Sequence, residues 1–329
     1  MMLKKIYTLV VVVLTLTSPN LLAQQMPLYS QYMFNHFLIN PATAGLDGYT
    51  SINLTAREQW VGLAGAPSTY SVSAQTRLLN GVFLFSKAAV RKTSSRASRD
   101  SRVGLGANIY NDHNGLINRT GLQLTYAYHL PMDEAELSFG LTGSFYQFSI
   151  NKSKMELLDQ DDKLINQSDL SMLLPDLNFG VFYTAKDYYA GVSVAQLLQS
   201  SVQFGNSGYE EYRMYRHYFI TGGYQFVLDR DYMLEPSTLI KVSKQGRPQI
   251  DISTKLYIRN DYWAGLSFRT GSAFVLMGGL TVDKYSFGYA FDYTLNSIRK
   301  NTFGSHEFMI AVKFGDSARR FRWLRNHNN

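Results

Sequence analysis

The sequence contains no cysteine, and this absence excludes disulfide bonds, thiolate metal sites, a cysteine nucleophile and a lipoprotein anchor. After the first 23 residues, no apolar run approaches the roughly 20 residues that a transmembrane helix needs. If the chain crosses a membrane, it must therefore do so with strands closed into a barrel, because an open sheet leaves unpaired backbone groups in lipid.

The abundant residues are tyrosine and phenylalanine, with 23 and 20 copies against 3 tryptophans and 8 prolines. Aromatic residues suit strands, and tyrosine also suits a boundary that is apolar on one side and wet on the other. The formal net charge of +7 is modest for 329 residues and is weak evidence for nucleic-acid binding. We therefore expect no nucleic-acid partner.

The start of the chain has the pattern of a cleavable signal peptide. Lys4 and Lys5 form a basic region, the apolar run 6–16 follows, and Ala23 ends a segment suited to cleavage. The apolar run is too short to span a bilayer, which argues against a permanent anchor. We therefore expect residues 1–23 to be removed from an exported protein.

From about residue 49 onward, segments of roughly ten residues alternate apolar with small or polar side chains. Clear examples are the runs 121–130, 137–145, 285–293 and 307–314. A period of two over eight or more residues indicates strands with unlike faces. We count about fourteen such strands, which begin near residues 49, 68, 102, 119, 135, 177, 188, 216, 232, 249, 262, 273, 285 and 306.

A soluble antiparallel sandwich would show the same alternation, but three features favour a transmembrane barrel. The strands are nearer ten residues than five or six, and their polar faces hold Gly, Ser, Thr, Ala and Gln rather than Lys and Glu. Aromatic residues gather at strand ends such as 188–189 and 262–263, where a membrane girdle would lie. We predict an all-β fold, a transmembrane antiparallel β-barrel over residues 49–314 in an outer membrane.

The connections between the predicted strands indicate an orientation. With the first strand running outward, every even-numbered connection should be a short periplasmic turn. Several are short and rich in Asp or Asn, namely 131–134, 186–187, 229–231, 260–261 and 283–284. The odd-numbered connections include the long segments 149–176, 196–215 and 294–305. This pattern predicts that both ends of the barrel chain lie on the periplasmic side.

Two basic segments are expected on that side, the long connection 79–101 and the tail 315–329. Charge runs are usually solvated tails, which is one interpretation of both. Their shared location makes contact with an acidic periplasmic partner or with lipid head groups a second hypothesis. The residues that would make these contacts are Arg91, Lys92, Arg96, Arg99, Arg319, Arg320, Arg322 and Arg325.

The sequence shows no catalytic constellation, metal-ligand spacing or phosphate-binding motif. We therefore expect no cofactor, no metal and no enzymatic activity, although catalytic residues that meet only in space would escape this search. His129 and Asp292 are expected to face the lumen without a special role. Arg57 and Glu58 are adjacent and could form an ion pair there.

Residues 24–48 differ in kind from the strands that follow. They are apolar and aromatic without alternation, and they carry turn signals at Asn40-Pro41 and Ala44-Gly45. If it were exposed to solvent, a stretch of this kind would promote association or aggregation. We expect it to pack in the barrel lumen as a plug, at the periplasmic mouth, or against a partner.

The same segment opens a series of motifs that resembles the PorP/SprF family. The motifs of this series include Tyr32-Met33-Phe34-Asn35, Asn40-Pro41-Ala42, Ala44-Gly45, Gln59-Trp60-Val61-Gly62, Gly65-Ala66-Pro67, Tyr126-Ala127-Tyr128-His129, Arg216-His217-Tyr218 and Gly304-Ser305-His306-Glu307. The resemblance covers essentially the whole mature chain. The basic connection 79–101 and the basic tail depart from it.

The resemblance implies a non-enzymatic outer-membrane component of the Bacteroidetes type IX secretion and gliding machinery. Its implied partners are outer-membrane lipid, periplasmic components of the machinery, and a secreted protein that it docks or anchors through a C-terminal sorting domain. A porin or transporter gated by the N-terminal segment is the alternative. The signature residues expected to serve docking are Tyr32, Met33, Phe34, Asn35, Asn40, Pro41, Gly45, Gln59, Trp60 and Gly62.

Overall fold

The computed structural model describes residues 29–78, 102–150, 171–202, 212–244, 246, 248–259 and 261–314. The expected signal peptide, the basic connection 79–101 and the basic tail 315–329 fall outside the described residues. The predictions for Arg91, Lys92, Arg96 and Arg99, and for the arginines of the tail, therefore stay predictions.

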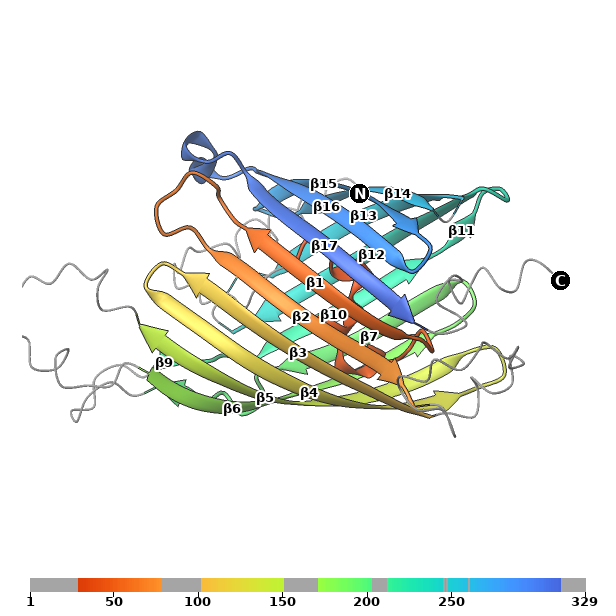
Figure 1. The fold of residues 1–329 in the computed structure, drawn as a ribbon, viewed down its shortest axis with the longest axis horizontal. Helices are drawn as coiled ribbons and strands as arrows, with labels where there is room; N and C mark the ends of the chain where they lie inside the picture. Colours follow the sequence, from red (N-terminus) through yellow and green to blue (C-terminus); the bar gives the residue numbers. More distant parts are fainter. Residues whose placement is uncertain are drawn as a thin grey trace, which may run out of the picture.

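One antiparallel sheet closes on itself to form a barrel (Figure 1). Neighbouring strands follow the chain order, and the ring closes because β1 pairs with both β2 and β17 while β10 pairs with both β7 and β12. The strands of this wall are β1 (Thr50–Glu58), β2 (Ser68–Arg77), β3 (Val103–Asn114), β4 (Ile117–Pro131), β5 (Glu136–Ile150), β6 (Ser171–Thr184), β7 (Tyr188–Ala195), β10 (His217–Tyr224), β11 (Phe226–Val227), β12 (Tyr232–Ser243), β13 (Gln249–Ile258), β14 (Tyr262–Arg269), β15 (Ala273–Val282), β16 (Tyr285–Thr294) and β17 (Ser305–Phe314).

The predicted count of fourteen strands is confirmed when β10 and β11 are taken as one strand interrupted at Gln225, since both pair with β12. The short strands β8 (Ser201–Val202) and β9 (Tyr212–Arg213) form a separate hairpin. One predicted start is wrong, because β6 begins at Ser171 and not near residue 177. Pro175 lies in this early part of β6, where the strand pairs only with β5, and such a sheet edge tolerates proline.

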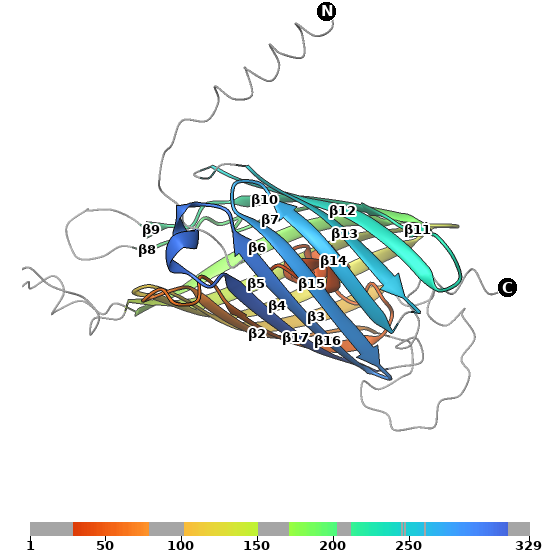
Figure 2. The ribbon, with the colours of Figure 1, turned by 90° about the horizontal axis from the view of Figure 1, so that it is seen from above.

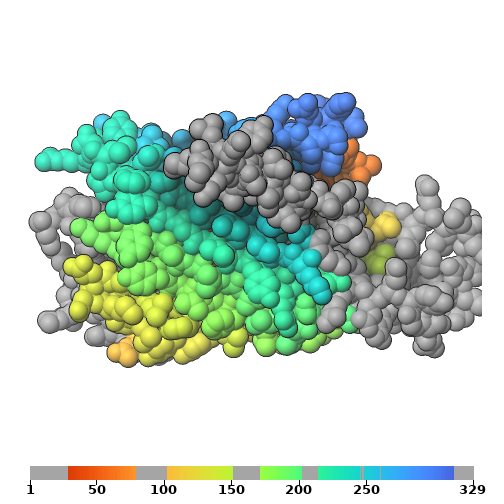
Figure 3. All heavy atoms as spheres, turned by 180° about the vertical axis from the view of Figure 1, so that it is seen from behind, coloured from red at the N-terminus to blue at the C-terminus, as the bar shows by residue number. Residues whose placement is uncertain are grey.

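Side chains of the wall alternate between an apolar outer face and a polar lumen. In β14, Leu266 and Phe268 face outward, whereas Ser267 and Arg269 are buried inside. Figure 3 shows one outer face, where the green and teal strands run side by side. A soluble protein has the opposite arrangement, so this distribution is that of a barrel in a membrane.

No helix among the described residues is long and apolar enough to cross a membrane.

The two ends of the barrel differ in their connections. At the loop rim, β1 ends at Glu58, β17 begins at Ser305, and the connections 59–67 and 295–304 lie close together (Figure 1). At the turn rim, β1 begins and β17 ends, and the connections 132–135, 185–187, 259–261 and 283–284 are short. The short turns lie together at one rim as predicted, whereas most of the long connections 149–176 and 196–215 fall outside the described residues.

The described part of the N-terminal segment, residues 29–48, lies inside the barrel and is called the plug below. It contains three short 3-10 turns, η1 (Tyr32–Phe34), η2 (His36–Leu38) and η3 (Pro41–Thr43). Figure 2 shows this red segment enclosed by the strands. Of the three predicted locations for residues 24–48, the described residues occupy the lumen.

The plug runs along the lumen from one rim toward the other. Near the turn rim, the Gly45 N–H donates to the Gln75 side chain (3.1 Å). Near the loop rim, the Ser30 N–H donates to the Glu307 carboxylate (2.7 Å). The first described residues of the plug therefore lie toward the end of the barrel opposite to Phe314.

Candidate functional site: a lumen plug bonded to buried ion pairs of the wall

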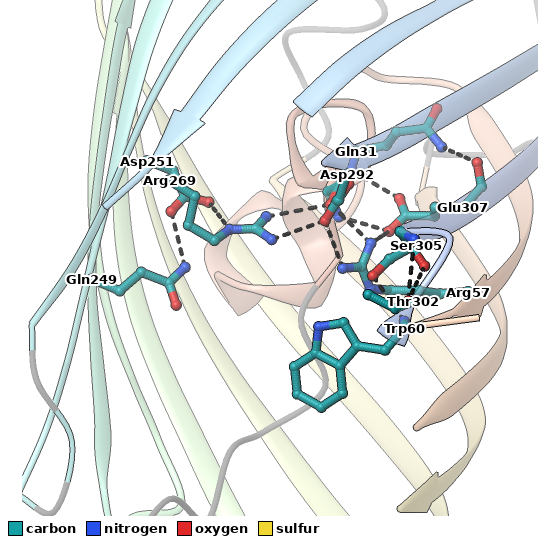
Figure 4. Close-up of polar contacts among 12 residues, drawn as sticks. Gln31, Arg57, Trp60, Gln249, Asp251, Arg269, Asp292, Thr302, Ser305 and Glu307 are labelled. Atoms are coloured by element: carbon teal, nitrogen blue, oxygen red, sulfur yellow. Dashed lines mark hydrogen bonds and ion pairs between the residues drawn. The ribbon is translucent and has the colours of Figure 1, made fainter. Parts of the chain in front are cut away.

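A clamp near the loop rim holds the beginning of the plug (Figure 4). The Glu307 carboxylate accepts the backbone N–H groups of Ser30 (2.7 Å) and Gln31 (2.8 Å). The Ser30 hydroxyl donates to Asp292 (2.8 Å), and Arg57 bridges both carboxylates at 2.8 Å and 3.1 Å. We call Ser30, Gln31, Arg57, Asp292 and Glu307 the N-terminal clamp.

The clamp continues into a larger network along the wall. Arg269 contacts Asp292 (3.1 Å) and Asp251 (3.0 Å), and the Gln249 amide donates to Asp251 (2.9 Å). Arg269 also donates to the Ser30 hydroxyl (3.3 Å). Two guanidinium groups thus face three carboxylates in a buried setting. Such charges are stable in a low-dielectric interior only when they are paired and hydrogen-bonded.

Strand periodicity explains why Arg57 joins this network and Glu58 does not. Successive side chains on a strand point to opposite faces, so the predicted ion pair between Arg57 and Glu58 is wrong. Arg57 is buried in the lumen, whereas Glu58 is exposed and accepts a hydrogen bond from the Tyr70 hydroxyl.

A second buried pair contacts the plug through an aromatic ring. Lys255 forms an ion pair with Glu235 (2.8 Å), and its Nζ lies 4.8 Å from the centroid of the Phe34 ring. The Gln225 amide also donates to Glu235 (3.1 Å). A cation over an aromatic face contributes an attraction that grows when water is excluded. The Phe34 ring of the plug is thereby held against the wall.

A third polar cluster holds the other end of the plug near the turn rim. Arg77 and Glu136 form a bidentate pair with two contacts of 3.1 Å. His129 lies beside Glu136, with its Nε2 2.9 Å from the Ala44 carbonyl and its Nδ1 2.8 Å from the Ser138 hydroxyl. His129 and Asp292 face the lumen as predicted. The expectation that they lack a special role is wrong, because both contact the plug.

Between these ends, Asn40 ties the plug to two strands. Its amide donates to the carbonyls of Val181 (3.0 Å) and Val192 (3.2 Å) on β6 and β7. Its side-chain oxygen accepts the Ala42 N–H (3.0 Å), which caps η3. One side chain therefore fixes both the local turn and its position against the wall.

Replacing Asn40 with alanine should weaken seating of the plug by about 1–2 kcal/mol, because it removes the cap and both contacts to the wall. The measurement is the urea midpoint of the folded barrel in detergent, together with protease sensitivity of the N-terminal segment. A shift below about 0.5 kcal/mol would contradict this role, since that is the size expected for a neutral surface change.

Glycines in the wall create the space that the plug fills. A Cβ atom at Gly104 would lie 1.9 Å from the Ala44 carbonyl oxygen, and one at Gly140 would lie 2.2 Å from the Ala42 nitrogen. At Gly180 it would lie 2.0 Å from the Asn40 side chain. Non-bonded heavy atoms do not approach so closely, so any larger residue forces the plug or the wall to move. These strands are shaped to hold the plug.

His36 gives the seated plug a dependence on pH. Its ring packs 5.2 Å from the Tyr189 ring and 6.2 Å from the Tyr32 ring. Desolvation by the surrounding protein and the positive charge of Lys255 lower the pKa of His36 to about 3. An unfolded chain takes up this proton near pH 6.5. The stability that neutral His36 contributes is therefore complete above pH 6.5 and is lost as the pH falls toward 3.

We expect the plug to loosen as the pH falls from 6.5 to 4, and the loosening should be smaller in a His36→Phe variant. Phenylalanine keeps the ring packing but has no proton to bind. The measurement is protease cleavage of the N-terminal segment, or ion conductance, at each pH in both proteins. An equal response to acid in both would assign the effect to other groups, such as the lumen carboxylates.

The signature residues divide between two places. Tyr32, Met33, Asn35, Asn40 and Pro41 are buried in the lumen, where they contact the wall. Phe34 is partly buried, and Gly45 lies against the backbone of Thr76. Gln59, Trp60 and Gly62 lie together in the connection 59–67 at the loop rim. A docking role for these residues stays a prediction, and in this structure the buried ones act as contacts of the plug.

The sequence interpretation missed the ion pairs of the lumen, although a signal was present for four of them. Their partners stand directly opposite each other on neighbouring strands, on the lumen face. A search for opposite charges at matched positions of adjacent strands would have found them. The pairs are Arg57 with Glu307, Asp112 with Arg119, Glu235 with Lys255, and Asp251 with Arg269.

A family model described as "Type IX secretion system membrane protein PorP/SprF" matches residues 21–312. The chain belongs to the PorP/SprF family. This confirms the resemblance seen in the sequence, and it makes the barrel a membrane component of a type IX secretion system. No curated protein matches the chain.

Solved structures are similar to this PorP/SprF protein at low identity. The outer membrane protein Omp33 from Acinetobacter baumannii is similar over 82% of this chain and 99% of its own, with 8% identity and a TM-score of 0.42. The CymD monoaromatic hydrocarbon channel is similar over 89% of this chain and 93% of its own, with 10% identity and a TM-score of 0.43.

Within the part of the chain that the structure describes, no three His, Asp or Glu side chains are placed to hold a metal ion.

Proposed function

We propose that this protein is a non-enzymatic outer-membrane component of the type IX secretion and gliding machinery. In this role it docks or anchors a secreted protein through that protein's C-terminal sorting domain, and it contacts periplasmic machinery. The turn rim would face the periplasm and the loop rim the cell surface. The family supports the secretion role, and the alternation of short turns and long loops supports the orientation.

The plug inside the lumen is the observation that carries this proposal. It is fixed near both rims by hydrogen bonds to side chains that belong to buried ion pairs of the wall, and between them by Asn40 and by close contacts with glycines. A diffusion pore needs a water-filled path, and here side chains of the plug and wall occupy the lumen. The work of the protein then falls to the surfaces at its two rims, where partners can bind.

Co-purification tests the proposal directly. The intact protein in detergent should retain the purified C-terminal sorting domain of a protein that the same secretion system exports, and should not retain an unrelated secreted domain. Failure to retain the sorting domain, with the barrel shown to be folded by its heat-dependent migration on a gel, would contradict the docking role.

A porin or transporter gated by the N-terminal segment is the second candidate, and one observation favours it. All the described contacts between plug and wall are non-covalent, so a plug of this kind can leave the lumen. Planar bilayers separate the two candidates. A deletion of residues 24–48 should conduct ions in either case, so the intact protein decides between them. The docking proposal expects the intact protein to show no conductance, and repeated openings of the intact protein would favour the porin.

A further inference from the structure

Two connections at the loop rim form one rigid surface, which we call the loop-rim platform and define as residues 59–67 and 295–305. The Val61 N–H donates to the Gly304 carbonyl (2.9 Å), and the Phe303 N–H donates to the Val61 carbonyl (2.8 Å). The Trp60 N–H donates to the Ser305 hydroxyl (3.1 Å). These bonds extend the pairing of β1 with β17 past the ends of both strands.

The platform is also braced from its other side. The Gly115 N–H in the turn between β3 and β4 donates to the Gly65 carbonyl (3.1 Å), and the Gln59 N–H donates to the Pro67 carbonyl (2.8 Å). The surface therefore reaches from β17 across β1 and β2 to the β3–β4 turn. A backbone held at so many points presents its side chains in fixed positions, which lowers the entropy lost when a partner binds.

One aromatic side chain stands out of this surface. Phe303 is 78% exposed, which is the highest value among the large apolar side chains that the structure describes. Its ring covers Gly62, where a Cβ atom would lie 3.1 Å from the ring, and Gly62 has a φ of 100° that favours glycine. The missing side chain of Gly62 thus lets the ring settle on the backbone of the loop.

The backbone of the platform is strained beside this ring. Trp60 has a φ of 47°, in the left-handed region that a bulky side chain rarely adopts. Figure 4 shows its indole ring directed away from the buried network. Strain of this kind persists where the surroundings impose it, and it concentrates at functional sites. Here the strained residue belongs to a connection that does not pack against the buried charges of the lumen.

The platform carries charge of one sign. Arg299 and Lys300, both exposed in η5 (Ser297–Asn301), are the only charged residues in the two segments. Figures 1 and 2 show η5 beyond the ends of the strands, at the mouth of the barrel. An exposed aromatic side chain beside two cations is complementary to a protein surface that offers an apolar pocket flanked by carboxylates.

We propose that the loop-rim platform binds an acidic face of the secreted C-terminal domain, with Phe303 inserted into a pocket of that domain and Arg299 and Lys300 paired to its carboxylates. This inference rests on the docking function proposed above and names its surface. A lipid head group would meet the same cations, but it does not require the fixed backbone or the ring seated on Gly62.

The test measures binding of the intact detergent-solubilised protein to the purified C-terminal sorting domain that it retains in the co-purification experiment. Phe303→Ala should weaken binding by about 10-fold or more, the size expected for a central aromatic anchor. The double variant Arg299→Glu/Lys300→Glu should slow association and remove most of its salt dependence. Leu228→Ala is the matched control for the aromatic, since Leu228 is 61% exposed at the turn rim. Arg230→Glu/Arg259→Glu is the matched control for the charges.

The outcomes separate this inference from the proposed function. If the unmodified protein binds the domain and the platform variants bind it equally well, the platform is excluded and the docking function stands. If the unmodified protein does not bind the domain, the docking function fails and the inference fails with it. If the variants lose binding only to lipopolysaccharide vesicles and keep binding to the domain, the surface anchors lipid and the inference is overturned. Unchanged heat-dependent migration of each variant verifies folding.

Discussion

Glu307→Ala should release the beginning of the plug and lower the free energy of unfolding by about 2–5 kcal/mol, the cost of leaving two buried backbone N–H groups without an acceptor. The carboxylate accepts two backbone N–H groups of the plug and pairs with Arg57. Its removal leaves those donors unsatisfied, whereas Arg57 keeps its ion pair with Asp292. We expect protease sensitivity of the N-terminal segment and, in planar bilayers, conductance that the unmodified protein lacks.

Glu58→Gln is the matched control for this experiment. Glu58 comes directly after Arg57 but points to the outer face, so its change should alter stability by less than about 0.5 kcal/mol. A Glu307→Gln variant refines the result, because it keeps the oxygen acceptor and removes the charge. If Glu307→Ala keeps its full stability and conducts no ions, the clamp does not hold the plug.

Gly140→Ala should displace the middle of the plug although it adds only one methyl group. That methyl would lie 2.2 Å from the Ala42 nitrogen and from the Pro41 carbonyl carbon, and both are backbone atoms that cannot rotate away. Overpacking of this kind costs about 1–3 kcal/mol. We expect the variant to assemble as a barrel, to conduct ions and to lose protection of the N-terminal segment.

Gly143→Ala provides the comparison on the same strand, because a Cβ at Gly143 meets no atom within 4 Å. The Gly143→Ala variant should assemble as a barrel and conduct no ions. If Gly140→Ala behaves like Gly143→Ala, the wall can relax around the added methyl, and the glycines do not form a seat for the plug. Conductance by both variants would point to a general weakening of β5.

The wall of the barrel was predictable because a period of two repeated over long strands is a strong local signal. The start of β6 was the exception, since residues 171–176 pair with β5 alone and include Pro175, a residue that is unusual within strands. The adjacent charges Arg57 and Glu58 suggested an ion pair only because the alternation of faces was not applied to them. The strands of the wall could thus be predicted from local sequence patterns, provided that the alternation of faces was applied to every residue.

The path of the plug was not predictable in the same way. Ser30 meets Glu307 across 277 positions of sequence, and Asn40 meets Val192 across 152. No local pattern in residues 24–48 indicates which wall residues they will meet. The apolar, non-alternating composition showed that the segment must be shielded from water, and three locations satisfied that requirement equally well. The deciding information lies in the glycines and charges of distant strands, which acquire meaning only when the barrel closes.

The seam between the first and last strands gives the clamp a role in assembly. Arg57 lies on β1 and Glu307 lies opposite it on β17, so the two halves of the clamp meet only when the final strand pair forms. Glu307 and Asp292, on β17 and β16, can accept the hydrogen bonds of Ser30 and Gln31 before that pair forms, but Arg57 reaches the two carboxylates only when β1 meets β17. Closure of the barrel thus supplies the cation that balances Glu307, so the carboxylate that holds the plug has its ion-pair partner only in the completed barrel.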